Sequence, residues 1–451
     1  MNRKLPPMAQ LSFAIVLSLG AMVVGTGPIA AADGDPYLVK DIHAADASSD
    51  PRELAAVGNL LYFSADDGSH GRELWRSDGT AGGTRMVRDI VAGSIGSIPS
   101  EITPLGTGFV FSASDPVAGR ELWISNGTRD GTNRLIDIRP GTKSSKPADF
   151  TVVGTHVYFT ADDGPHGREV WRTDGTAPGT ALVRDLTPGT NRTGPRELTA
   201  LGTRLFLVAR TGLWKTDEDA AGIRPVFDSK GHSVRRPHSL VATDSYLYFA
   251  ARNSSGDESL WRTTGANSST RAMLDHVVPQ NLTAAEDTLF FSTPGAPGEL
   301  SHLWTSNGSR AGTLLVKDVW TVTEMTAVGA LVFFAATNPD GWEEMYVSDG
   351  TPYGTGWNHS HNTFGDPGLK NMVDFNGVPY FTFHNYLAVV ECDNGCAAGY
   401  SWRPVVPYEY DGGDTSWSVR NLVVVGGTLF YSGWDAHAPV DHGQELWAYV
   451  P

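Results

Sequence analysis

The sequence predicts an all-β fold, a single closed β-propeller built from four-stranded blades. Three observations support this prediction. Related segments recur 48 residues apart, from Trp75 to Trp123 to Trp171, and a repeat of this length is typical of propellers and solenoids. Each repeat holds four short strand-like runs. The two ends of the chain supply complementary parts of one repeat.

The first complete repeat defines the four runs. Residues 53–57 form run a, 60–64 run b, 73–76 run c and 85–90 run d, with turn-forming residues between them. Run b, Leu-Leu-Tyr-Phe-Ser, is largely apolar at consecutive positions, which is typical of a strand buried on both faces. Four short strands in a unit of about 40–50 residues make a propeller blade.

Run b can be followed along almost the whole chain. Its second residues are Tyr62, Val110, Tyr158, Phe206, Tyr248, Phe290, Phe333, Tyr380 and Phe430. We therefore predict nine blades, although propellers usually have about four to eight. The alternative is eight blades, with the degenerate eighth repeat around residues 386–399 forming an insertion.

The chain ends predict how the ring closes. The last repeat stops after its run c, at residues 445–451, whereas residues 37–42 match run d. The N-terminal run therefore completes the C-terminal blade and covers a strand edge that would otherwise be unpaired.

Residues 1–32 have the pattern of a secretion signal. Arg3 and Lys4 precede an apolar run over 11–24 that is too short to span a membrane comfortably, and three alanines follow at 30–32. We therefore predict a signal peptide over 1–32 and a propeller over 33–451. The protein is expected to be secreted to the extracellular space, the cell surface or the periplasm, without a membrane span. An uncleaved anchor is the alternative.

The charge of the chain limits its partners. The net charge is −16, and it becomes −18 without residues 1–32, which hold two basic residues and no acidic one. Such a chain repels nucleic acid and anionic lipid. The expected partners are cations, a glycan or another protein, and the chain is expected to be a monomer. Solubility alone is the alternative reason for the charge.

The only two cysteines, Cys392 and Cys396, flank an Asp-Asn-Gly turn. In an exported chain, cysteines this close predict a disulfide bond. Two thiols without a nearby histidine leave zinc short of ligands. A redox pair is the remaining alternative.

The segments Glu73-Leu-Trp-Arg-Ser-Asp-Gly-Thr80 and Glu121-Leu-Trp-Ile-Ser-Asn-Gly-Thr128 resemble the ELWxxDGT repeat, sometimes labelled hyalin-like, of exported bacterial proteins. The match is strongest in the first three repeats and weakest in the fourth, fifth and eighth. The resemblance implies export and a repeat fold, and it implies no catalytic residues.

Residues that recur in the repeats are expected to build the blades. Trp75 and its equivalents are expected to fill the core between blades. Asp78, Gly79 and Thr80 are expected to form the turn between runs c and d. A calcium loop is the alternative for this turn, but it would need more carboxylates at alternating positions.

Ligand binding is expected where the copies differ. In a propeller the b-to-c loops share one face with the d-to-a connections, and here these loops vary. The candidate ligand-binding residues in these loops are Asp66, Asp67, His70, Asp162, Asp163, His166, Trp342, Trp434 and Asp435.

A second candidate site lies at the residue that opens run a near the axis. The residues at this position are Glu53, Glu101, Asp149, Glu197, Ser239, Asn281, Glu324, Asn371 and Asn421. All carry a side-chain oxygen, so ring closure would gather metal ligands suited to calcium, with Glu53, Glu101, Asp149, Glu197 and Glu324 as the carboxylates. The alternative is that each binds a neighbouring backbone or an arginine. Arg52 and Arg196 precede Glu53 and Glu197, but adjacent residues of a strand point to opposite faces, which disfavours that pairing.

Catalytic signatures are missing from the sequence. It has no G-x-S-x-G, H-E-x-x-H or P-loop motif. This favours a non-enzymatic exported propeller that binds a protein or glycan through its variable face, without settling whether the chain is an enzyme. The alternatives are a propeller hydrolase or lyase that uses the axial carboxylates with calcium, and a purely structural surface component.

Overall fold

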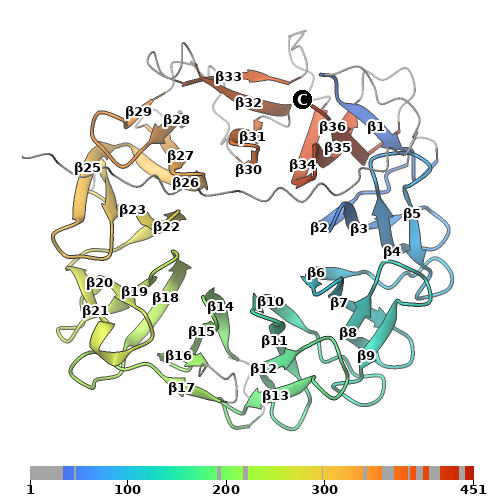
Figure 1. Ribbon diagram of the computed structural model, residues 1–451, viewed down its shortest axis with the longest axis horizontal. Coiled ribbons are helices and arrows are strands. Elements are labelled where there is room, and N and C mark those ends of the chain that lie inside the picture. Colours follow the sequence, from blue (N-terminus) through green and yellow to red (C-terminus); the bar gives the residue numbers. More distant parts are fainter. Residues whose placement is uncertain are drawn as a thin grey trace, which may run out of the picture. The chain divides into compact units, whose positions relative to one another are not determined.

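The structure, a computed structural model, is a nine-bladed β-propeller (Figure 1). Nine four-stranded antiparallel sheets form a ring, as predicted. The chain divides into two units, Met1–Ala32 and Asp33–Pro451. The structure describes residues 34–44, 47–189, 194–216, 222–296, 298–338, 343–357, 370–383, 386–392, 400–405, 417–435 and 442–451. The predicted signal peptide therefore lies outside the described residues.

The first five blades follow one another along the chain. Blade one is β2 (Arg52–Val57), β3 (Leu60–Asp66), β4 (Arg72–Ser77) and β5 (Arg85–Arg88); blade two is β6 (Ser100–Leu105), β7 (Gly108–Asp115), β8 (Gly119–Ser125) and β9 (Asn133–Ile136); blade three is β10 (Ala148–Val153), β11 (His156–Asp162), β12 (Arg168–Thr173) and β13 (Ala181–Arg184). Blade four is β14 (Arg196–Leu201), β15 (Arg204–Ala209), β16 (Gly212–Thr216) and β17 (Ile223–Pro225); blade five is β18 (Arg235–Ala242), β19 (Leu247–Arg252), β20 (Glu258–Thr263) and β21 (Arg271–Asp275).

The remaining four blades complete the ring. Blade six is β22 (Gln280–Ala285), β23 (Thr288–Thr293), β24 (Ser301–Ser306) and β25 (Thr313–Val319); blade seven is β26 (Thr321–Val328), β27 (Leu331–Thr337), β28 (Glu343–Ser348) and β29 (Gly356–Trp357). Blade eight is β30 (Lys370–Phe375), β31 (Val378–Phe383), β32 (Tyr386–Cys392) and β33 (Tyr400–Pro404); blade nine is β34 (Trp417–Val425), β35 (Thr428–Asp435), β36 (Glu445–Tyr449) and β1 (Tyr37–Lys40). Among the described residues the only helix is one turn of 3₁₀, η1 (Asn267–Ser269), and no helix there is long and apolar enough to cross a membrane.

The ring closes through the N-terminal strand, as predicted. β1 pairs antiparallel with β36, with Leu38 opposite Trp447. On the inner side, the first strand of each blade contacts the first strand of the next, and β34 contacts β2 to complete the circle. The first and the last described strands therefore share one sheet, and the ninth blade has four strands.

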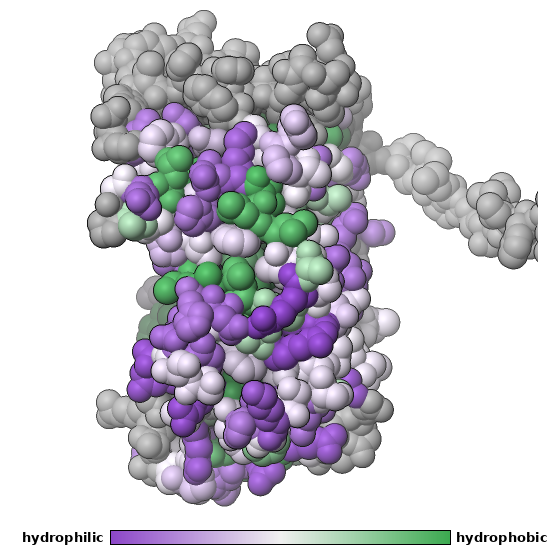
Figure 2. Space-filling model, turned by 90° about the vertical axis from the view of Figure 1, so that its left-hand side faces the viewer, coloured by the Kyte–Doolittle hydropathy of each residue, from purple (hydrophilic) through white to green (hydrophobic). Residues whose placement is uncertain are grey.

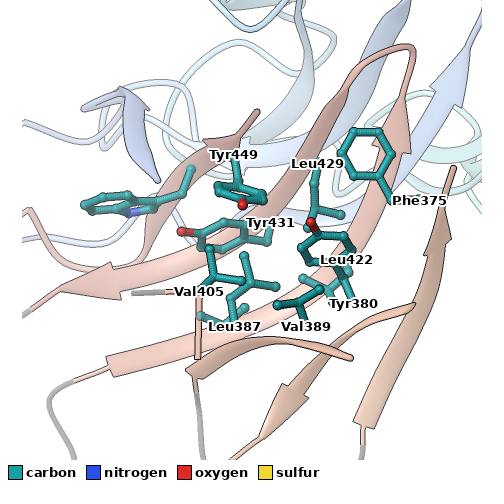
Figure 3. Close-up of a cluster of buried hydrophobic side chains, with 11 residues drawn as sticks. Phe375, Tyr380, Leu387, Val389, Val405, Leu422, Leu429, Tyr431 and Tyr449 are labelled. Atoms are coloured by element: carbon teal, nitrogen blue, oxygen red, sulfur yellow. The ribbon is translucent and has the colours of Figure 1, made fainter. Parts of the chain in front are cut away.

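The core lies between the blades rather than at the centre. Nine clusters of buried apolar side chains each combine residues of two neighbouring blades. Figure 3 shows the cluster between blades eight and nine, where Tyr380 and Leu387 meet Leu429, Tyr431 and Tyr449. The second strand of each blade packs against a neighbouring blade on both faces, so β3 is buried over most of its length. This is the physical reason for the consecutive apolar residues of run b.

The repeated residues have the structural roles predicted for them. Trp75, Trp123 and Trp171 are 5%, 6% and 9% exposed and belong to the core between blades. In the turn after β4, Asp78 Oδ1 accepts hydrogen bonds from the N–H and hydroxyl of Thr80 at 2.9 and 2.7 Å. In blade two, Asn126 takes the place of this aspartate, and its Oδ1 accepts the same two hydrogen bonds from Thr128. A neutral amide thus replaces the carboxylate, as expected of a structural turn.

One side of the outer wall of the ring is polar with apolar interruptions. Figure 2 shows the side of the ring on which β25 lies in Figure 1, where hydrophobic residues appear among hydrophilic ones. On this outermost strand of blade six, Leu314 and Leu315 are 57% and 47% exposed. Their neighbour Val316 is buried, so the strand presents an apolar edge only over these two residues.

Candidate functional site

The predicted axial residues lie at a bulge in the first strand of each blade. Eight of the nine have a left-handed backbone, with φ between 51° and 60°: Glu53, Glu101, Asp149, Glu197, Ser239, Asn281, Asn371 and Asn421. In blade one the pairing of β2 with β3 shifts between Arg52 and Ala55, on either side of Glu53. Glu324 is the exception. A left-handed conformation is costly for residues other than glycine, asparagine and aspartate, so the glutamates at this position need compensating contacts.

The compensating contacts join one blade to the next. Glu53 Oε2 accepts the backbone N–H of Glu101 at 2.9 Å, and Glu101 Oε2 accepts that of Phe150 at 3.2 Å. Glu197 Oε2 likewise accepts the N–H of Leu240 at 3.1 Å. These carboxylates therefore link the inner strands around the axis. This is the backbone-binding alternative for the axial residues.

Two further axial residues vary this contact. Asn421 Nδ2 donates to the carbonyl of Pro51 at 3.4 Å, which ties blade nine to blade one. Asp149 has a shorter side chain, and its Oδ2 accepts from the hydroxyl of Thr160 in its own blade at 2.8 Å. Within the described part of the chain, no group of three His, Cys, Asp or Glu side chains is placed to hold a metal ion. Calcium binding at this position stays a prediction.

The expectation that Arg196 is a poor partner for Glu197 is wrong. Arg196 Nε lies 3.8 Å from Glu197 Oε1. The alternation of side chains in a strand fails here because the left-handed residue interrupts the extended backbone. Arg52 instead pairs with Asp50, with Nη2 2.5 Å from Oδ2.

The second candidate site, in the b-to-c loops, contains two matching pairs of an aspartate and a histidine. Asp67 Oδ2 lies 2.8 Å from His70 Nδ1, and Asp163 Oδ2 lies 2.7 Å from His166 Nδ1. Both imidazoles are 44% exposed. The hydrogen bond to the aspartate, followed by its charge, raises the pKa of each histidine. Each ring is thus fixed through one nitrogen and open to solvent.

The histidines are not needed to form these loops. In blade two the equivalent aspartate, Asp115, accepts the N–H groups of Val117 and Ala118 at 2.7 and 2.8 Å without any histidine. Asp67 makes the same type of contact with the N–H groups of its own loop. The aspartate therefore shapes the loop, and the histidine is an addition found in only some copies.

The other predicted ligand-binding residues lie in their own local surroundings where the structure describes them. Asp66 accepts the N–H of Gly68, and Asp162 pairs with Arg139 at 2.8 Å. Trp434 is half-buried in β35, whereas Trp342 and the side chain of Asp435 lie outside the described residues. The predicted disulfide also falls outside them, because neither Cys396 nor the side chain of Cys392 is described.

A buried glutamate on the third strand is a feature that the sequence analysis missed. Glu73 is fully buried and accepts hydrogen bonds from the N–H and hydroxyl of Ser97 at 3.0 and 2.5 Å. Glu121 does the same with Ser145. We call this arrangement the carboxylate clamp; it comprises Glu73 with Ser97, Glu121 with Ser145, Glu169 with Thr187 and Glu445 with Ser49. The spacing of 24 residues from Glu73 to Ser97 and from Glu121 to Ser145 was the available signal.

The clamp of blade nine holds the N-terminal segment. Glu445 accepts the N–H groups of Ile42, His43 and Ser49 and the hydroxyl of Ser49, at 2.6 to 3.3 Å. Burial outweighs these hydrogen bonds and raises the pKa of Glu445 to about 7. Ring closure therefore depends on a buried carboxyl group as well as on strand pairing.

Comparison with known proteins finds similarity only at the level of solved structures. No family model matches the chain, and no curated protein matches it. A puromycin hydrolase structure is 14% identical with a TM-score of 0.38, and the match covers 80% of this chain and 62% of that one. Oligopeptidase B from Leishmania major is 12% identical with a TM-score of 0.43, over 88% of this chain and 55% of that one. The β-propeller domain of the Trilobed protease from Pyrococcus furiosus is 9% identical with a TM-score of 0.39, over 78% and 94%.

These comparisons correct the functional expectation. At such identities the likeness concerns the fold, and the chain spans less than two thirds of the length of puromycin hydrolase and oligopeptidase B. The proteins named are peptidases, however, and not binding proteins without activity. The expectation of a non-enzymatic propeller that binds a protein or glycan is therefore contradicted by the peptidases among these structures, while the likeness itself shows the fold alone.

Proposed function

We propose that this propeller takes part in the hydrolysis of peptides and that His70 and His166 are its general bases. One observation carries the proposal. Each imidazole is held by an aspartate through Nδ1 and is 44% exposed, in a loop that blade two forms without a histidine. A histidine that the loop does not need, but that is held in one orientation, has the geometry of a general base.

The chemistry follows from the fixed ring nitrogen. Because Asp67 accepts the Nδ1 proton, Nε2 carries the lone pair of the neutral ring. Nε2 can take a proton from water as the water oxygen bonds to the peptide carbonyl carbon. When the carbon–nitrogen bond breaks, the imidazolium returns that proton to the leaving amine. The raised pKa of His70 makes the neutral ring a stronger base, which favours the first step, and makes its imidazolium a weaker acid.

The test is cleavage of a fluorogenic peptide library by the chain from residue 33 onward. We expect His70→Gln combined with His166→Gln to lower cleavage at least about 100-fold, the usual contribution of a general base. His156→Gln is the matched control, because His156 opens β11 beside the a-to-b turn, on the opposite face. Wild-type protein that cleaves no peptide, or a double variant as active as the control, would remove the proposal.

Export is a second part of the proposal. It is supported by the basic and apolar pattern of residues 1–32 and by two cysteines placed four residues apart, Cys392 and Cys396. Mass spectrometry of protein recovered from culture medium or periplasm is expected to find cleavage near residue 32 and a Cys392–Cys396 bond under non-reducing conditions. An intact N-terminus with two free thiols would contradict it.

A further inference from the structure

Four exposed arginines lie at the junction of blades four and five. Arg235 of β18 lies directly opposite Arg252 of β19. The N–H of Arg236 donates to the carbonyl of Thr211 at 3.0 Å, which places Arg236 beside the turn that contains Arg210. All four arginines are exposed on the face that carries the b-to-c loops. We call them the arginine cluster.

The charges of this cluster are almost unopposed. Arg252 Nε lies 3.9 Å from Glu258 Oε2, but in the described part of the chain the other three guanidinium groups have no ion pair or hydrogen bond. Asp228, in the connection between β17 and β18, pairs with His232, whose Nδ1 lies 3.2 Å from Asp228 Oδ2. Like charges facing each other across strands are destabilising. They are unexpected in a chain with 50 acidic and only 34 basic residues.

The cluster stands where the repeat is broken. In blades one to three the clamp pairs a glutamate with a buried serine or threonine of the next connection. At this junction Gly212 takes the place of the glutamate and Arg235 that of the serine. A feature absent from the other copies is not required to build a blade. The departure removes a buried carboxyl group and exposes a cation.

The turn that contains Arg210 also indicates that this arginine is not there to build the blade. Two residues, Arg210 and Thr211, connect β15 to β16, and Arg210 has a φ of 54°. Two-residue hairpin turns favour asparagine or glycine at such positions, because the left-handed conformation is costly for other residues. An arginine is held there although a more favourable residue exists.

We propose that Arg210, Arg235, Arg236 and Arg252 form a binding site for the carboxylates of an acidic peptide segment. Guanidinium groups match carboxylates with two parallel hydrogen bonds. The net charge of −16 repels a long polyanion such as nucleic acid. Screening over about 8 Å at physiological ionic strength leaves the local field of the cluster to attract a compact anionic group. The site goes beyond the proposed hydrolysis and does not depend on it.

Binding of fluorescein-labelled hexaglutamate to the chain from residue 33 onward tests the site. We expect saturable binding that weakens with added salt, and no binding of hexalysine. Arg235→Gln with Arg236→Gln is expected to weaken binding by about tenfold or more, the value of one charged hydrogen bond. Arg210→Gln with Arg252→Gln should do the same.

A matched control removes the same charge elsewhere. Arg129 and Arg271 are exposed beside c-to-d turns, on the opposite face, and replacing both with glutamine is expected to change binding less than twofold. Circular dichroism checks that each variant is folded. No binding by the wild type, or equal losses in the cluster and control variants, would overturn the site. Inorganic phosphate that displaces the peptide at lower concentration than free glutamate would overturn the assignment to carboxylates.

Discussion

Blades one to three and the junction of blades four and five fill the same repeat position in opposite ways. In the first region a fully buried glutamate accepts the backbone and hydroxyl of a buried serine, as Glu121 does with Ser145. In the second, glycine replaces the glutamate, and Arg235 lies exposed opposite Arg252. The first arrangement joins two blades, and the second leaves cations free for a ligand.

The difference teaches where function can arise in a repeat protein. A residue found in most copies has a structural partner in the neighbouring blade, as the axial glutamates do. A residue found in one or two copies, such as His70 or Arg235, has either a local partner or none. The predictions below test this separation, starting with the change expected to have the largest effect.

Removing residues 37–42 is expected to have the largest effect. The deletion takes away β1 and two buried side chains, Val39 and Ile42, which are 3% and 7% exposed. Burial of two such side chains contributes about 4 kcal/mol, and Glu445 also loses a hydrogen bond from the N–H of Ile42. Thermal melts should show a large loss of stability with aggregation. A deletion variant that melts like the parent would mean that the ring is not closed by β1.

The clamp of blade nine predicts a pH dependence. The pKa of Glu445 is raised from 4.5 to about 7, so its contribution to stability is fully present below about pH 4.5. That contribution is lost as the pH rises through 7, and it amounts to at most about 3 kcal/mol. Chemical unfolding between pH 5 and 8 should show stability falling with pH. Glu445→Gln should flatten the slope, and an unchanged slope would mean that this carboxyl group does not titrate here.

Breaking a clamp in a regular blade should cost more than changing the same position in an irregular one. Glu121→Ala leaves the N–H groups of Ile138 and Ser145 without their acceptor, at about 2 kcal/mol. The equivalent residue of blade six, His302, pairs at the surface with Asp318, so His302→Ala should cost less than about 1 kcal/mol. Urea unfolding measures both. Equal losses would mean that the clamp adds nothing to its blade.

The smallest effect is expected in the turn after the third strand. Asp78→Asn should change stability by less than about 0.5 kcal/mol, because Asn126 makes the same contacts in blade two. Melts with millimolar calcium and with chelator should agree for both proteins. A calcium-dependent shift lost in the variant would instead identify this turn as a metal loop.

Much of the fold could be predicted because each blade is built from local signals. Consecutive apolar residues marked the buried second strands, and the match between residues 37–42 and run d gave the closure. Aligning the repeats identified the axial position, but it did not predict the backbone conformation there. Nothing in the residue types of Glu53 or Glu101 indicates a left-handed backbone, and that conformation is what turns the carboxylate to the next blade.

The candidate sites were harder to predict for the same reason. Asp67 and His70 were chosen from a variable loop, but their pairing became visible only in the folded loop. Arg210 and Arg252 are 42 residues apart in sequence. Arg252 lies opposite Arg235 through strand pairing, and Arg236, the next residue, contacts Thr211, which follows Arg210. The repeat period shows which residues occupy equivalent positions in different blades. It does not show which residues at different repeat positions the fold brings close together.

Installing a clamp at the irregular junction tests the central claim most directly. Gly212 has room for a side chain, since the atoms nearest to an added Cβ are 3.8 and 4.0 Å away. Gly212→Glu combined with Arg235→Ser should raise stability by about 1 kcal/mol through the new hydrogen bonds, while binding of hexaglutamate falls at least about tenfold. The measurement is a urea unfolding curve beside a binding titration on the same protein. Lower stability with unchanged binding would contradict the division between residues that build the ring and residues that act on ligands.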